Sequence, residues 1–400
     1  MLRQTTLTVL LVLVFGCAMK GELPRTEPDL GAEAAHSALA QKAVLADYVR
    51  THHMSPEEYV ISKFEEHDVV CIGEQHRIKH DVELIQRIIP ELYENGIYTL
   101  GTEFGRREDQ PRIDSLLNAP AWDEALARQV TFNQSVTWGF REYVDVYRAA
   151  WQLNHGLPEG ARRFRILGLG DSLDWSVIQK PEDRNDPAIM KKVWHGEGEH
   201  LWAKVVLDEV ITKGEKALTY SGIHHAFTQY RQPNWSIEKQ RLIRFEDRRM
   251  GNFLYREIGK RAITIYLHAP WNSAEGWEAP MVQPADGIIE SVMAELEPEY
   301  IPVGFDTKGT PFGRLPGETS MYMYGYEDFT LETFCDGYIY QMPISEFRGV
   351  TPIEGFINED NIEYARLQMP NPAYRHASIE QFNNAIAADA DIPRRFANVR

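Results

Sequence analysis

The chain alternates short apolar runs with longer amphipathic segments between about residues 68 and 341. This alternation is typical of α/β proteins, in which helices join the strands of a sheet. The apolar runs predict seven strands, at 68–72, 97–102, 164–169, 217–223, 262–267, 300–305 and 338–341. Because parallel strands need crossover connections, we expect one domain with a mostly parallel sheet that helices flank on both faces.

Between these runs, apolar residues recur at the spacing of helices. The predicted helices include 80–94, 201–211, 237–258 and 288–296, and Ser236 is expected to cap the third of them. Pro90 lies inside the first and is expected to kink or split it. The tail, 361–400, carries one predicted helix at 378–388.

The first residues, MLRQTTLTVLLVLVFGCAMK, have one cation, Arg3, before an apolar core at 7–15 that is too short to span a bilayer. Val14, Gly16 and Cys17 resemble the bacterial lipobox, which implies cleavage before Cys17 and acylation of its thiol. An ordinary secretory signal and an uncleaved membrane stub are the alternatives. The lipobox implies a protein of the bacterial cell envelope, anchored by lipid to the outer membrane and facing the periplasm.

The composition divides the whole chain into four parts. A lipoprotein signal peptide is expected at 1–16, and a tether rich in Pro, Glu and Ala at 17–39. An α/β domain follows at 40–360, and the tail at 361–400 completes the chain. Cys71 and Cys335 lie beside apolar runs and are expected to be buried thiols, although the sequence leaves a disulfide between them open.

Charge narrows the class of partner. The chain has 42 Lys and Arg against 59 Asp and Glu, a formal net charge of -17. A protein that binds nucleic acid needs a basic surface, so we expect no nucleic-acid partner.

Polar side chains follow five of the predicted strands, where the carboxyl ends of parallel strands bind ligands. Carboxylates and imidazoles together can hold a divalent cation, or can supply a general base and a general acid. The candidate catalytic residues are His76, Glu74, Glu103, His268 and Asp171, and the candidate metal ligands are His76, Glu103, His225 and His224.

Each of these residues also has a purely structural interpretation. Glu74 and His76 could be solvated loop residues, and Asp171 could cap a turn. Neighbouring residues of a strand point to opposite faces, so we expect at most one of His224 and His225 to face a given metal.

Two segments, VVCIGEQHRIKHDVELIQRIIPELYENG and IYTLGTEFG, resemble the start of the superfamily of erythromycin esterase-like, ChaN-like haem-uptake and Tiki-type proteins. Those families share a strand that ends in Gly-Glu-x-His or Gly-x-x-His, a helix, and a strand that ends in Glu. FRILGLGD, FEDRRMGNFLYREI, CDGYIYQMPISEFRGVTPI and ITIYLHAPW, with His268, resemble the esterase-like branch. SGIHH, with His225, resembles the late Gly-x-x-His of the other two branches.

The branches imply different functions. The esterase-like branch implies hydrolysis with a histidine base, and the Tiki branch implies a metal-dependent hydrolase. The ChaN branch implies a lipid-anchored protein that binds haem or iron without turnover. We therefore expect a lipid-anchored hydrolase, esterase- or peptidase-like and with or without a metal, that acts on a small-molecule or peptide substrate. The alternative is a ChaN-like haem- or iron-binding lipoprotein.

Overall fold

The computed structural model describes residues 30–400 except 237 and 277. Cys17 and the predicted signal peptide therefore lie outside the described residues. Helix α1 (Leu30–His52) contains residues 30–39 of the predicted tether. The body of the chain, Lys42–Arg400, forms one compact unit.

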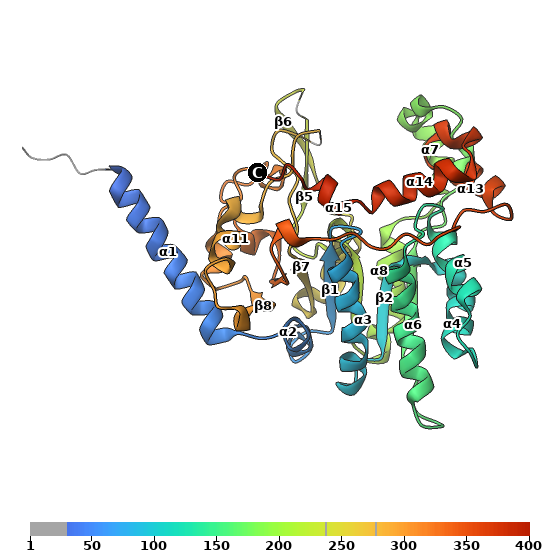
Figure 1. The fold of residues 1–400 in the computed structure, drawn as a ribbon, viewed down its shortest axis with the longest axis horizontal. Helices are drawn as coiled ribbons and strands as arrows, with labels where there is room; N and C mark the ends of the chain where they lie inside the picture. The colour runs from blue at the N-terminus through green and yellow to red at the C-terminus, as the bar shows by residue number, and fades with distance from the viewer. Residues whose placement is uncertain (1–29, 237, 277) are drawn as a thin grey trace, which may run out of the picture. The chain divides into compact units, whose positions relative to one another are not determined.

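Seven strands form one sheet in the order β3-β2-β4-β1-β7-β9-β8 (Figure 1). All neighbouring pairs in this sheet are parallel except β8 with β9. The α/β class with a mostly parallel sheet is therefore confirmed. The strands are β1 (Val69–Glu74), β2 (Thr99–Arg106), β3 (Arg165–Gly170), β4 (Ala217–Gly222), β7 (Ala262–Leu267), β8 (Val303–Asp306) and β9 (Gly337–Tyr340).

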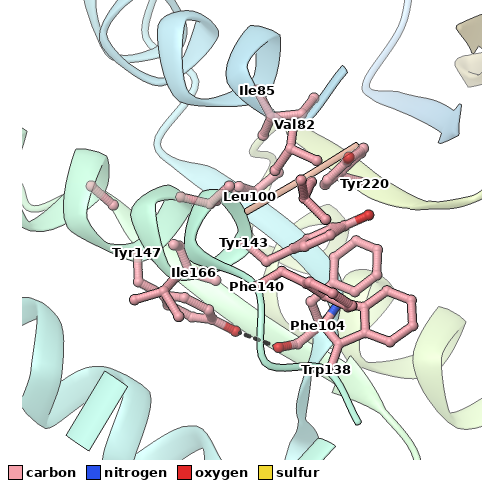
Figure 2. Packing of buried hydrophobic residues seen from close by; sticks show 14 of the residues in the cluster. Val82, Ile85, Leu100, Phe104, Trp138, Phe140, Tyr143, Tyr147, Ile166 and Tyr220 are labelled. Atoms are coloured by element: carbon pink, nitrogen blue, oxygen red, sulfur yellow. Dashed lines mark hydrogen bonds between the residues drawn. The ribbon is translucent and has the colours of Figure 1, made fainter. Parts of the chain in front are cut away.

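Two hydrophobic cores cover the two faces of the sheet. Alternate residues of β1 enter different cores, because side chains of a strand point alternately to opposite faces. Val70 and Ile72 pack in one core with Ile85, whereas Val69 and Cys71 pack in the other with Val206. Figure 2 shows part of the first core, in which Tyr147 Oη donates a hydrogen bond to the carbonyl of Phe104 at 3.0 Å.

The longer helices supply these cores. Helices α3 and α6 lie against each other over the first core, and α8 contacts α10 over the second. The helices of the body after α1 are α2 (Pro56–Lys63), α3 (Lys79–Glu94), α4 (Gln110–Asn118), α5 (Glu124–Gln134), α6 (Arg141–Gly156), α7 (Pro187–Trp194), α8 (Glu199–Glu209), α9 (Ile223–Ala226), α10 (Met250–Ile258), α11 (Ile288–Met293), α12 (Leu331–Phe334), α13 (Ile362–Gln368), α14 (Ile379–Asp389) and α15 (Ile392–Arg395).

The predicted helix at 237–258 is wrong in its first half. This part of the chain holds a hairpin of β5 (Gln232–Ser236) and β6 (Arg241–Glu246), and α10 begins only at Met250. Trp235 stacks on Tyr324 at 4.3 Å and Phe245 contacts Tyr326 at 5.0 Å, so packing on these distant aromatic rings outweighs the local helical pattern. Ser236 Oγ accepts the backbone N–H of Lys239 in the turn and caps no helix.

Two further expectations differ from the structure. Helix α3 continues through Pro90, so Pro90 does not split it. The tail holds three α-helices, α13 to α15, where one was expected. The helices α13 and α15 have only seven and four residues, too few to give a periodic signal, and each buries an isoleucine, Ile362 and Ile392.

Cys71 and Cys335 are buried free thiols, so the disulfide that the sequence left open is not formed. Among residues 30–400, apart from the two undescribed positions, no helix is both long enough and apolar enough to cross a membrane.

Glu142 joins three segments that are distant in the sequence. This buried carboxylate on α6 accepts the backbone N–H of Thr351 at 2.6 Å and the hydroxyl of Thr351 at 2.8 Å, and lies 3.1 Å from Lys79 Nζ. A Glu142→Gln variant should lose about 1–3 kcal/mol of unfolding free energy in urea denaturation, because it removes charged hydrogen bonds from a buried site. Glu83→Gln is the matched control. Glu83 is partly exposed and lies 3.8 Å from the same lysine, so equal losses in the two variants would contradict this account.

Candidate functional site

A buried carboxylate and an imidazole meet where β1 ends. Glu74 is 1% exposed, and its Oε1 lies 2.8 Å from His76 Nδ1. The same oxygen accepts the hydroxyl of Tyr143 at 2.5 Å, and Oε2 accepts the hydroxyl of Tyr220. Because an ionised carboxylate only accepts hydrogen bonds, His76 carries a proton on Nδ1, and its Nε2 is directed towards Glu103.

Aromatic rings hold the His76 imidazole in place. The ring lies edge-on to Trp138, with centroids 5.1 Å apart, and edge-on to Phe104 at 5.9 Å. Figure 2 shows Phe104 and Trp138 beside Tyr143, whose hydroxyl reaches Glu74. The rings that build the core therefore also fix the orientation of the imidazole.

Glu103 lies between two imidazoles. Its Oε1 is 3.7 Å from His76 Nε2, and its Oε2 is 3.8 Å from His225 Nε2. The backbone N–H of Gly222 donates to Oε2 at 2.6 Å and fixes the carboxylate at the end of β4. Gly222 also lets His76 approach, since a Cβ at this position would stand 2.7 Å from His76 Cε1.

The second imidazole belongs to an ion-pair network. His225 Nδ1 lies 2.9 Å from Glu199 Oε2, and Arg249 Nη1 donates to Glu199 Oε1 at 2.9 Å. Burial lowers the pKa of His225, but the carboxylates of Glu199 and Glu103 outweigh it and raise this pKa to about 9. Burial raises the pKa of Glu199, but His225 and Arg249 bring it to about 2. At neutral pH the site therefore holds an imidazolium at His225.

A pocket of about 580 Å³ opens onto both imidazoles. Part of its wall comes from the end of the chain, where Arg395 Nη1 donates to the carbonyl of His76 at 3.1 Å and the N–H of Arg400 donates to the carbonyl of Met281. The pocket is lined by Glu74, Gln75, His76, Gly222, Ile223, His224, His225, Asn272, Glu278, Ala279, Pro280, Met281, Arg395 and Asn398.

Asp171 lies in a neighbouring network. Its Oδ1 accepts the indole N–H of Trp202 at 2.7 Å and a hydrogen bond from Arg107 Nη1 at 3.0 Å. The Trp202 ring lies 4.7 Å from the His225 ring, so Asp171 supports the second imidazole through this tryptophan. It does not line the pocket.

The other two predicted histidines, His268 and His224, form hydrogen bonds with residues outside the pair of Glu103 and His76. His268 is buried, with Nδ1 2.6 Å from the Tyr338 hydroxyl and Nε2 2.8 Å from Glu290 Oε1, and it does not line the pocket. His224 lines the pocket, but its Nε2 lies 3.0 Å from the Tyr322 hydroxyl, and burial lowers its pKa to about 3. His225 is therefore the member of this pair that faces Glu103.

The predicted divalent metal site finds no support. Over the part of the chain that the structure describes, no group of three or more His, Cys, Asp or Glu side chains is arranged to hold a metal ion. His76 and His225 each direct one ring nitrogen to a carboxylate and the other towards Glu103, so the imidazoles pair with acids within the protein.

Glu199, Arg395, Tyr143 and Tyr220 belong to the site but were not predicted from the sequence. Glu199 begins α8 and Arg395 ends α15, and neither follows a predicted strand. Tyr143 lies within α6 and Tyr220 within β4, where an aromatic residue is expected to be part of the hydrophobic core. Neither tyrosine could have been found from the sequence, because the pairing of β4 with β1 that places Tyr220 beside Ile72 is seen only in the structure.

Residues 60–159 match the family model described as haem-binding uptake, Tiki superfamily, ChaN. The resemblance to this superfamily is confirmed over that segment. The matched residues include Glu74, His76 and Glu103, which the structure brings together in one site. No curated protein matches this chain in sequence.

Solved structures show low similarity to this chain. A Bacillus cereus protein is 12% identical with a TM-score of 0.47, covering 78% of this chain and 98% of its own. A succinoglycan biosynthesis protein is 10% identical with a TM-score of 0.46, covering 73% and 90%. A mutant erythromycin esterase in its open conformation is 12% identical with a TM-score of 0.43, covering 70% and 91%.

The charge on His225 can be measured directly. Its imidazole should titrate at about pH 9 in an NMR titration, because Glu199 and Glu103 hold the proton. Since this pKa is above the ordinary 6.5, the stabilisation from the ion pair is fully present below about pH 6.5 and is lost as the pH rises through about 9.

A Glu199→Gln variant should lower the His225 pKa and remove this pH-dependent part of the stability. Lys204 and Asp208 form an exposed pair on the same helix, so Asp208→Asn is the matched control and should leave the titration unchanged. A wild-type His225 that titrates near 6.5 would contradict the network.

Proposed function

We propose that this protein is a hydrolase of esters that uses His76 as a general base and needs no metal. The observation that carries the proposal is the arrangement of two imidazoles, His76 and the charged His225, on either side of the Glu103 carboxylate at a single pocket. The match to the ChaN and Tiki superfamily supports the binding of a small molecule. The ester chemistry is inferred from the residues of the site.

His76 is built to accept a proton. Glu74 holds the Nδ1–H and would stabilise the imidazolium that forms, as a carboxylate does for the histidine of a catalytic triad. The hydroxyls of Tyr143 and Tyr220 keep Glu74 ionised by donating to it. His76 Nε2 and Glu103 Oε1 are both acceptors, and their separation of 3.7 Å lets one water molecule donate a hydrogen atom to each.

His225 supplies positive charge on the other side of Glu103. The imidazolium Nε2–H can donate to an oxygen on which negative charge develops, without losing its proton at neutral pH. The side chain is 24% exposed, so a substrate in the pocket can reach it.

The reaction follows from these positions. His76 Nε2 takes a proton from water while the water oxygen bonds to the ester carbonyl carbon, and the carbonyl oxygen becomes an oxyanion beside His225. The tetrahedral intermediate then breaks its bond to the alkoxy oxygen, which takes the proton from His76. The products are a carboxylic acid and an alcohol, and His76 returns to its neutral form.

The pocket favours a small substrate. Its volume of about 580 Å³ lies within the range of small-molecule sites. Ile223, Pro280 and Met281 supply an apolar wall, and Arg395 places a guanidinium next to the loop of His76. A peptide substrate would have to enter from the open side of the pocket.

Haem binding is the second candidate, and the family match to haem-binding uptake proteins favours it. His225 fits a haem iron poorly, because it holds its proton at neutral pH, whereas His76, with Nδ1 directed to Glu74, has its other ring nitrogen available to a haem iron. Titration of the full chain with haem decides this candidate. A saturable Soret shift that His76→Gln removes would support it, and no shift would eliminate it.

We further propose that Cys17 is lipidated and holds the protein in the bacterial envelope, on the outer membrane and facing the periplasm. The lipobox-like residues Val14, Gly16 and Cys17 support this proposal. Metabolic labelling with a palmitate analogue should mark the wild-type protein and leave Cys17→Ala unmarked.

Substitution of His76 tests the proposed hydrolase most simply. His76→Gln should lower kcat/KM for a nitrophenyl ester by about 10²–10⁴-fold, because it removes the base. The melting temperature should fall only modestly, since Tyr143 and Tyr220 still donate to the buried Glu74. His376 is exposed and lies outside the pocket, so His376→Gln is the matched control. Equal turnover by the two variants, or no turnover by the wild type on any ester, would contradict the proposal.

A further inference from the structure

A second cavity lies at the carboxyl end of β2, on the same edge of the sheet as Glu103. Its volume is about 740 Å³, and residues of α4, α5 and the segment 355–364 surround it. It shares no lining residue with the pocket of His76.

Three arginines line this cavity, and two of them are already paired. Arg112 Nη1 lies 2.6 Å from Asp109 Oδ1, and Arg128 Nε lies 3.1 Å from Glu124 Oε1. Asp109 also accepts two hydrogen bonds from Asn133, so its charge is satisfied within the protein.

Arg106 is the third arginine, and it differs from the other two. It is the last residue of β2, it is half-buried, and no carboxylate of the described residues lies within ion-pair distance of its guanidinium. Its Nε is buried and has no hydrogen-bond partner. A buried donor on a charged group without a partner is costly, and an anion that accepts from it would remove that cost.

Aromatic rings form another part of the cavity wall. Phe132 lies 5.8 Å from Phe356 and 5.7 Å from Tyr364, measured between ring centroids. Tyr364 is 41% exposed, which leaves one side of this group open to a ligand. Aromatic side chains in this arrangement bind a planar ring by stacking or by edge contacts.

We propose that this cavity is a separate binding site for a small aromatic compound that bears one anionic group. The anion pairs with the Arg106 guanidinium, whose planar fork suits a carboxylate or a phosphate, and the ring lies against Phe132 and Tyr364. The inference does not depend on the proposed hydrolase.

The acids at the cavity limit the charge of the ligand. Glu108 and Asp360 line it with no ion-pair partner among the described residues. They would repel a ligand with a second anionic group placed away from Arg106. Glu108→Gln should therefore tighten the binding of a monoanion.

Isothermal titration of the full chain with benzoate and with phenyl phosphate tests the site. Inorganic phosphate and phenol, which are the two halves of phenyl phosphate, are titrated for comparison. We expect at least one of the two whole compounds to bind at least about tenfold more tightly than either half. Benzoate and phenyl phosphate together show whether the anion is a carboxylate or a phosphate. Inorganic phosphate that binds as tightly as phenyl phosphate would overturn the role of the ring.

Arg106→Gln should weaken binding by about tenfold or more, because it removes a charged hydrogen bond, and Phe132→Ala should weaken it by about threefold or more. Arg163 is exposed and lies outside the cavity, so Arg163→Gln is the control for loss of a positive charge. Arg106→Lys keeps the charge and should bind better than the Gln variant if the folded structure is intact.

His225→Gln separates this site from the other pocket. It should leave the affinity for the aromatic anion unchanged. If His225→Gln abolishes binding and Arg106→Gln does not, the anion binds at the imidazolium and the proposal is wrong. If neither benzoate nor phenyl phosphate binds at millimolar concentration, the proposal is also wrong.

Discussion

The organisation of the site depends on one buried carboxylate, Glu74, at the end of the central strand. A carboxylate that is 1% exposed destabilises the fold unless donors surround it. Tyr143 from α6 and Tyr220 from β4 provide two donors, and His76 provides the third. Burial, and then the charge of Glu74, raise the pKa of both tyrosines, so they remain protonated donors.

The same requirement orients the catalytic imidazole. His76 can satisfy Glu74 only with a protonated Nδ1, and this orientation directs Nε2 towards Glu103. The helix α6 and the strand β4 that pack against β1 therefore set the geometry as well as the stability of the site. The second imidazole, His225, also lies against carboxylates. Glu199 and Glu103 raise its pKa and keep it charged. A general base at His76 beside a charged His225 would give the separation of roles that acid and base chemistry needs.

The fold could be predicted from the sequence because its strands are short, continuous apolar runs between amphipathic helices. Seven such runs predicted seven strands, and each is present. The hairpin of β5 and β6 could not be found, since Trp235 and Phe245 pack on rings at 324 and 326 that no local pattern reveals. The helices α13 and α15 of the tail escaped because seven and four residues are too few to give a periodic signal.

The site was predictable only in part. Glu74, His76, Glu103 and His225 follow strands of the sheet, and the rule that parallel strands bind ligands at their carboxyl ends brings them together. That rule also selected His268, which instead turns into the core towards Tyr338 and Glu290. Glu199 and Arg395 come from helices, so only the tertiary structure places them at the pocket.

The central claim is that a charged His225 assists a neutral His76. The pH dependence of kcat/KM for ester hydrolysis tests it most directly, in the wild type and in His225→Gln. The account predicts that wild-type activity falls as the pH rises through about 9, where His225 loses its proton, and that the variant is slower and lacks this fall. An unchanged alkaline fall in the variant would contradict the account.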